Sequence, residues 1–253
     1  MDENKTNCDL QFEDFIYDIV DGKAVITEYR GDAKTLYVPS YINGYEVVEF
    51  DVFEFGSEEV SKVRNIIFPG TIQRFNFWNH NLIKTVRIES GCKSIPDRAF
   101  ADLQNLELVD LSDTVTTIGK EAFTYCKSLK YIRIPDGCTC IGDDAFAYSG
   151  LSDIFIPKSV KKIGENPFCG CDVLSLHLHP ENQSFDLVDE MVLYTADYSR
   201  LIWCYPCYPK ILEVPEELTS VDSTALMGCE LYGFKIPSDC KAFDGMELQY
   251  KLM

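Results

Sequence analysis

The chain has 253 residues, of which 46% are hydrophobic and 25% are charged, so a sizeable core is available to one large domain or two small ones. Its 41 acidic residues outnumber its 23 basic ones and give a formal net charge of −18. This balance argues against nucleic acid and against an anionic membrane surface as partners, because both require basic patches. No run approaches the ~18 apolar residues of a membrane helix, so we expect no membrane insertion.

The first residues, MDENKTNCDLQFEDF, are polar and acidic and lack the basic start and apolar stretch of a secretion signal. Eleven cysteines in such a chain favour a reducing compartment, and their odd number leaves at least one unpaired in any set of intramolecular disulfides. We therefore expect a cytoplasmic protein as the sequence is written, or an extracellular or cell-surface one if a leader was removed.

Two β-rich runs follow, Phe15–Val20 and Ala24–Tyr29, on either side of Asp21-Gly22. Asp-Gly is a strong hairpin signal, because glycine accepts the positive φ that a tight turn needs. We expect an antiparallel hairpin that caps the open apolar end of a stack of repeats, as the terminal unit of a repeat protein must.

From residue 35 onward the chain repeats one pattern, clearest in residues 129–174, where LKYIRIPDGCTCIGDDAFAYSG is followed by LSDIFIPKSVKKIGENPFCGCDVL. The leading leucines of successive repeats stand 24, 23, 22 and 23 residues apart, at Leu82, Leu106, Leu129, Leu151 and Leu174. Self-similarity at a fixed period of this length predicts a solenoid.

Within one repeat, the alternation in I-x-I-P predicts a strand with its isoleucines inward and its x residues outward. Proline cannot donate to a sheet and ends the strand. The following I-G allows a tight bend, and D-D-A-F or K-E-A-F predicts a short helical turn with acids near its N-terminus. The phenylalanine anchors this turn, and each repeat leaves an apolar face that its neighbour covers.

The seventh repeat breaks the rhythm. After the strand at Leu176 and Leu178, two further β runs, Met191–Thr195 and Arg200–Cys204, predict an inserted antiparallel hairpin. We expect one domain over residues 1–253, whose parts are a lead-in and hairpin cap (1–34), repeats one to seven (35–178), the hairpin insertion (179–209), and repeats eight and nine with a C-terminal cap (210–253).

Residues 129–171 resemble the BspA-like leucine-rich repeats, also called the Treponema pallidum type, whose consensus is close to L-x-x-I-x-I-P-x-x-V-x-x-I-G-x-x-A-F-x-x-C. The resemblance covers most of residues 35–243. It implies an α/β repeat fold, a right-handed curved solenoid with a concave parallel sheet and a short helical or irregular convex side. It also implies a binding role without catalytic residues, and many relatives are surface or secreted proteins that attach to host or matrix proteins.

The cysteines suggest a zinc site, because Cys204 and Cys207 form a CxxC motif with His177 and His179 upstream. Repeat phase explains most of the eleven differently. It places six as small core residues, namely Cys92, Cys126, Cys138, Cys171, Cys229 and Cys240. It leaves five whose redox state stays open, namely Cys8, Cys140, Cys169, Cys204 and Cys207. No second CxxC pairs with the first, so we favour unligated thiols and expect no metal and no cofactor.

Catalysis has little support in the sequence. A cysteine nucleophile needs a histidine and an orienting group in one cleft, and the chain has only three histidines. No nucleophile-elbow, phosphate-loop or dinucleotide-binding motif is present. We expect no enzyme.

The outward residues of the ladder of strands are the candidate binding surface. Counting the x of I-x-I and the neighbouring outward position gives Tyr37, Ile67, Arg87, Asp110, Tyr131, Arg133, Asp153, Phe155, His177, Glu213 and Lys235. This surface is less acidic than the chain and more apolar than solvation requires, which favours binding over a merely solvated face. Its area, roughly 600 Å², approaches the ~800 Å² per partner of a stable protein interface.

The sequence therefore predicts a non-catalytic module that binds a protein or peptide through the concave face, as a monomer. The alternatives are a cell-surface or secreted adhesin, a self-associating structural protein, and a metal or thiol enzyme.

Overall fold

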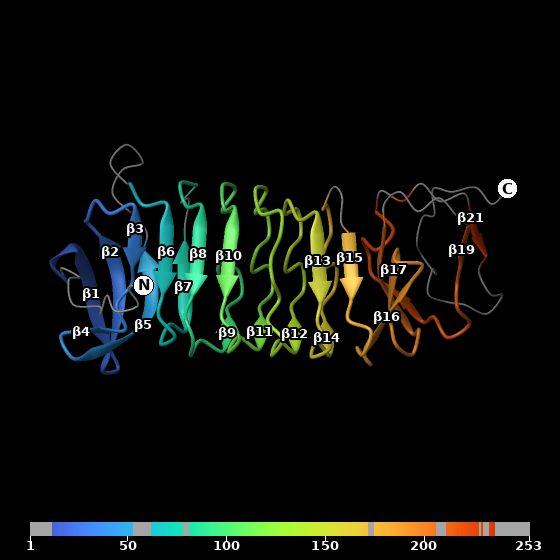
Figure 1. Cartoon of the computed structure of the whole chain (residues 1–253), viewed down its shortest axis with the longest axis horizontal. Coiled ribbons are helices and arrows are strands. Elements are labelled where there is room, and N and C mark those ends of the chain that lie inside the picture. Colours follow the sequence, from blue (N-terminus) through green and yellow to red (C-terminus); the bar gives the residue numbers. More distant parts are fainter. Residues whose placement is uncertain are drawn as a thin grey trace, which may run out of the picture.

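The computed structural model describes residues 12–52, 62–77, 81–171, 175–205, 211–227, 229 and 233–235. The strands of successive repeats follow one another in a row along the long axis of the molecule (Figure 1). The expected C-terminal cap and three of the cysteines, Cys8, Cys207 and Cys240, lie outside the described residues.

The I-x-I segments form the parallel strands of the ladder. Four of them make one sheet, namely β3 (Thr35–Tyr37), β6 (Asn65–Phe68), β8 (Thr85–Ile88) and β10 (Leu108–Leu111). Two more, β13 (Asp153–Ile156) and β15 (Ser175–Leu178), make a second sheet, and Tyr131 joins β13 by a single bridge to Asp153. A third pair is β19 (Ile211–Glu213) with β21 (Gly233–Lys235). Burial alternates along β8, β10 and β13 as the period of two predicts.

A further parallel sheet, made of other strands than the ladder, runs along the opposite edge of the repeats, at the bottom of Figure 1. Its strands are only two residues long, β9 (Ser94–Ile95), β11 (Thr117–Ile118), β12 (Cys140–Ile141) and β14 (Lys162–Ile163). In each, the isoleucine that precedes the proline or glycine is buried.

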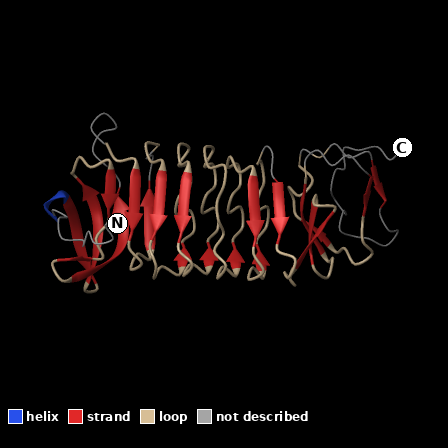
Figure 2. Ribbon diagram, in the orientation of Figure 1, coloured by secondary structure: helices blue, strands red, loops and turns tan. Residues whose placement is uncertain are grey.

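The prediction of a short helical turn after I-G is wrong, and so is the helical part of the α/β assignment. The helix found among the described residues is the single 3-10 turn η1 (Phe12–Asp14), and the repeats consist of strands and turns (Figure 2). The backbone N–H groups of Glu121, Phe123 and Tyr125 donate to carbonyls of the next repeat at 2.8 to 2.9 Å. Because Glu121 and Tyr125 adopt positive φ, this backbone bonds across repeats instead of within a helix.

At the N-terminal end, β1 (Phe15–Val20) and β2 (Lys23–Tyr29) pair antiparallel around Asp21-Gly22, which both have positive φ. β2 continues into a five-stranded sheet with three strands that the sequence did not predict, β4 (Tyr41–Ile42), β5 (Tyr45–Val52) and β7 (Arg74–Phe77). This sheet lies at the left end of the row in Figure 1.

The break in the seventh repeat is an antiparallel unit. β17 (Val192–Thr195) and β18 (Arg200–Cys204) pair at the position of the expected hairpin, and β16 (Phe185–Val188), which was not expected, pairs with β17. β18 also pairs parallel with β20 (Ser220–Val221), so the unit leads back into the repeats.

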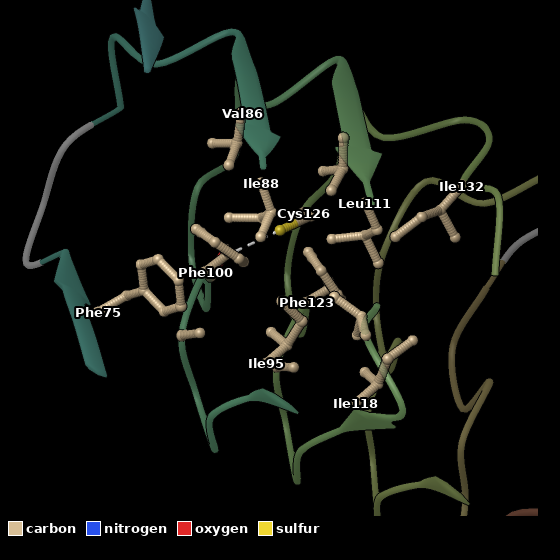
Figure 3. Close-up of a cluster of buried hydrophobic side chains, with 14 of the residues drawn as sticks. Phe75, Val86, Ile88, Ile95, Phe100, Leu111, Ile118, Phe123, Cys126 and Ile132 are labelled. Atoms are coloured by element: carbon tan, nitrogen blue, oxygen red, sulfur yellow. Dashed lines mark hydrogen bonds between the residues drawn. The ribbon is translucent and has the colours of Figure 1, made fainter. Parts of the chain in front are cut away.

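The core consists of a long column of side chains between the sheets and a second, smaller cluster around β17, β18 and β19 that includes Cys229. Neighbouring phenylalanine rings along the column lie 4.7 to 6.0 Å apart, in the order Phe50, Phe68, Phe75, Phe100, Phe123, Phe146 and Phe168. Figure 3 shows three of them, Phe75, Phe100 and Phe123. Five of the six cysteines predicted inward are buried, namely Cys92, Cys126, Cys138, Cys171 and Cys229. Cys126 also donates to the carbonyl of Phe100 at 3.1 Å.

Candidate binding surface

The outward side chains of the ladder strands share one side of the molecule, which we call the ladder face. Register joins the predicted residues directly, because Tyr37 pairs with Ile67, Ile67 with Arg87, and Arg87 with Asp110. Further along, Phe155 pairs with His177 and Glu213 pairs with Lys235. The structure therefore brings the predicted positions into three register-matched groups instead of one unbroken ladder.

Two carboxylates on the ladder face lie close to a nitrogen-bearing side chain. Arg87 Nε lies 3.2 Å from Asp110 Oδ2, and His177 Nε2 lies 3.5 Å from Asp153 Oδ2. These side chains are all about half exposed, so each pair contributes little to folding stability. Each pair nevertheless places a carboxylate beside a nitrogen donor on the face.

Arg133 has its partner beyond the end of a strand. Its Nη2 donates to Asp113 Oδ1 at 2.6 Å, and this hydrogen bond raises the pKa of the Arg133 guanidinium. Asp113 was missed by counting alternate strand residues, because it follows β10 by two positions. A groove of about 580 Å³ lies beside it at the C-terminal ends of β8 and β10, lined by Arg87, Asp110 and Asp113 among others.

The middle of the ladder face exposes three large apolar side chains next to charged ones. Leu108, Tyr131 and Phe155, which we call the central patch, are 53%, 49% and 39% exposed. Phe155 also packs edge-on against the His179 ring, with the ring centroids 6.1 Å apart. Three large apolar side chains within three consecutive repeats leave more hydrocarbon in water than a solvated face needs.

One row of side chains in the N-terminal part of the face is polar and hydrogen-bonded within itself. Asn65 Nδ2 donates to Thr35 Oγ1 at 3.1 Å, and Thr85 Oγ1 donates to Asn65 Oδ1 at 2.8 Å. Such a row of side-chain hydrogen bonds stabilises the strand register. It offers fewer open donors and acceptors to a partner than the same residues unpaired.

A pair of exposed tyrosines that was not predicted lies in the turns that follow the two-residue strands, which we call the turn side. The rings of Tyr125 and Tyr148 stack with centroids 4.9 Å apart and planes 7° apart, and both side chains are about 40% exposed. A hydrogen bond with the Cys169 thiol raises the pKa of Tyr148. The recurrence of F-x-Y in two consecutive repeats, A-F-T-Y and A-F-A-Y, is the signal that could have revealed this pair.

The sulfur and histidine candidates lie only partly within the described residues. Among the described residues no three His, Cys, Asp or Glu side chains cluster as metal ligands would, and His80 and Cys207 lie outside those residues. Cys204 is buried, and its hydrogen bond with the Cys229 thiol raises its pKa. Burial raises the pKa of Cys138 to about 11, so this thiol is a poor nucleophile at neutral pH.

The repeats identify the family. The model for the BspA type leucine rich repeat region matches residues 58–186 in six copies, just over half of the 253 residues. The chain belongs to the BspA-type leucine-rich repeat family. No curated protein sequence matches it.

Solved structures of leucine-rich repeat proteins share its fold. The pneumococcal vaccine antigen PcpA is 21% identical with a TM-score of 0.64, covering 91% of this chain and 66% of its own. A leucine-rich cell surface protein from Faecalibacterium prausnitzii is 23% identical with a TM-score of 0.58, covering 85% and 66%. A leucine-rich repeat protein from Eubacterium ventriosum is 18% identical with a TM-score of 0.64, covering 89% and 60%. At these identities the likeness establishes the fold alone, and the chain spans less than two thirds of each of the three.

Within the described residues, no helix has the length and apolarity to cross a membrane.

Proposed function

We propose that this BspA-type repeat protein is a non-catalytic interaction module that binds a protein or peptide partner on the ladder face. The central patch carries the proposal. Leu108, Tyr131 and Phe155 expose apolar side chains on the ladder face, where Arg87 lies beside Asp110 and His177 lies beside Asp153. A partner that covers the patch gains the burial of this hydrocarbon and separates few ion pairs.

Arg133 is the second component of the proposed site. It shares the face with Tyr131, two residues earlier, and its bond to Asp113 at 2.6 Å restricts its guanidinium before any partner arrives. Arginine and tyrosine are enriched among residues that dominate binding energy, and a side chain that is already ordered loses less entropy on binding.

The test replaces Tyr131, Arg133 and Phe155 together with alanine and compares the proteins captured by the variant and by the unchanged chain. All three side chains are exposed, so we expect the thermal midpoint to change little. Recovery of the specific partners should fall at least tenfold. A variant with Tyr125→Ala and Tyr148→Ala is the matched control, because it removes exposed aromatics from the turn side. Loss of capture in the control but not in the triple variant would place binding on the turn side and overturn the proposal.

We further propose a cell-surface location. The similar F. prausnitzii structure is named a cell surface protein, which gives the cytoplasmic expectation no support. Limited proteolysis of intact cells, followed by mass spectrometry, tests the location. Release of peptides from residues 62–171 without cell lysis supports it, and protection of these residues contradicts it.

A further inference from the structure

The ladder is interrupted after β15, which leaves one edge of that strand unpaired within the described part of the chain. β15 pairs with β13 in a two-stranded sheet, and the next ladder strands, β19 and β21, form a separate sheet. The chain between them forms the antiparallel unit of β16, β17 and β18 (Figure 1).

Backbone geometry shows which groups face the open edge. The N–H groups of Ser175 and His179 donate to the carbonyls of Ser152 and Ile156 at 2.8 and 2.9 Å, toward β13. Alternate residues of a parallel strand bond to opposite neighbours. The backbone groups of Leu176 and Leu178 therefore point away from β13, to the side where no described strand pairs with β15.

The side chain of Leu178 is correspondingly less covered than its counterparts. Ile88, Leu111, Ile134 and Ile156, at the same position of the earlier repeats, are all at most 3% exposed. Leu178 is half-buried and lines a groove of about 280 Å³ between β15 and β16. Phe185 and Leu187 of β16 form the apolar part of the other wall.

The groove carries two carboxylates. Asp186 and Glu190 belong to its lining together with the imidazoles of His177 and His179, and among the described residues that line it there is neither lysine nor arginine. Asp186 accepts a hydrogen bond from the Tyr198 hydroxyl, and Glu190 is exposed on the β16 side. A partner that fills the groove therefore gains electrostatically by carrying positive charge.

We propose that a basic, extended segment of a partner protein binds the open edge of β15 as an additional strand. Its backbone pairs with the N–H and C=O groups of Leu176 and Leu178, and alternate apolar side chains enter the groove beside Leu178 and Phe185. Its lysine or arginine side chains lie near Asp186 and Glu190. This edge site adjoins the central patch, because Phe155 packs against His179 of the groove lining. Its strand edge and its carboxylates are not patch residues, so the variants below test it independently of the proposed function.

The experiment uses the full chain and a fluorescein-labelled ten-residue peptide of alternating valine and lysine. Fluorescence anisotropy measures its affinity, and hydrogen exchange measures the Leu176 and Leu178 amides. We expect both amides to exchange fast in the free chain and to become at least tenfold slower with bound peptide. A peptide of the same composition with its valines and lysines in separate blocks has the same charge, and should bind at least tenfold more weakly.

Variants assign the site. The double variant Asp186→Asn, Glu190→Gln should weaken binding about tenfold, whereas Glu181→Gln, outside the groove, should leave it unchanged. Equal binding of the two peptides would mean general attraction to an acidic protein and would overturn the proposal. Slow exchange of both amides in the free chain would also overturn it, because the edge would already be occupied. Concentration dependence of that protection would identify a second copy as the occupant, and its absence would identify a segment of the chain itself.

Discussion

Arg200 and Asp222 form a bidentate ion pair, with Nε to Oδ1 at 2.6 Å and Nη2 to Oδ2 at 2.7 Å, where the regular repeats resume. The same guanidinium donates to the carbonyls of Ile163 and Gly164, both at 2.8 Å. In the regular repeats such an isoleucine carbonyl accepts from the N–H of the next glycine, as Ile141 does from Gly164. The Arg200 side chain thus supplies a donor that the interrupted repeat lacks.

The Arg200–Asp222 ion pair predicts a large loss of stability for Asp222→Ala. The Asp222 side chain is 4% exposed and that of Arg200 is 23% exposed, so the substitution leaves a largely buried cation without its counter-ion. We expect the free energy of unfolding in urea to fall by about 3–5 kcal/mol. The exposed pair Arg87 and Asp110 is the matched control, where Asp110→Ala should cost at most about 1 kcal/mol. Equal losses in the two variants would contradict a stabilising role for the buried Arg200–Asp222 ion pair.

Periodicity predicted what depends on neighbouring repeats, such as the inward positions of Phe146 and Cys138 and the outward position of Tyr131. Periodicity could not predict the contacts of Arg200, because that arginine bonds to residues 22 to 37 positions away across an irregular unit. Local propensity read D-D-A-F as helical, whereas hydrogen bonds to the next repeat determine the turn. On the ladder face, alternation found Arg133 and missed its partner Asp113, which lies past the end of the strand.

Gly142 of the I-G motif serves close packing. A Cβ built there would lie 2.5 Å from the backbone nitrogen of Lys120 and 2.6 Å from the carbonyl carbon of Gly119. The motif was expected to permit a bend, yet Gly142 is not among the residues with positive φ. Because backbone atoms of the previous repeat cannot rotate aside, we expect Gly142→Ala to lower the free energy of unfolding by about 1–3 kcal/mol.

The matched control for Gly142 is Gly137→Ala, whose Cβ would meet a single backbone atom, the Asp113 oxygen, at 3.0 Å. Urea unfolding of both variants should show the smaller loss at Gly137. A Gly142→Ala variant as stable as the unchanged chain would refute the packing role.

The stacked pair of Tyr125 and Tyr148 is expected to be energetically coupled. Both residues adopt positive φ, 58° and 56°, a conformation that costs a side-chain-bearing residue about 1–2 kcal/mol. Stacking offsets part of that cost. A double-mutant cycle with Tyr125→Ala and Tyr148→Ala should give a coupling of about 0.5–1.5 kcal/mol in unfolding measurements. Additive losses would show that the two rings do not stabilise each other.

The hairpin turn between β17 and β18 should make stability depend on pH through Asp197. Thr195 Oγ1 and Ser199 Oγ donate to Asp197 Oδ1 at 2.7 and 2.8 Å, and the Ser199 N–H adds a third bond at 3.1 Å. These hydrogen bonds lower the pKa of Asp197 to about 2. In the unfolded chain an aspartate titrates near pH ~3.9, so the unfolded state takes up the proton first as the pH falls. The stabilisation by Asp197 is therefore fully present above the unfolded pKa and is lost as the pH falls from about 4 to about 2.

The measurement is the difference in unfolding free energy between the unchanged chain and Asp197→Asn, followed from pH 6 to pH 2. We expect a constant advantage of the unchanged chain at the upper end that shrinks below about pH 4. NMR titration of the Asp197 carboxyl gives the folded pKa directly, and Thr195→Val should raise that pKa by removing the hydroxyl that stabilises the anion most. A carboxyl that titrates near pH 4 in the folded chain would show that the turn does not hold the anion.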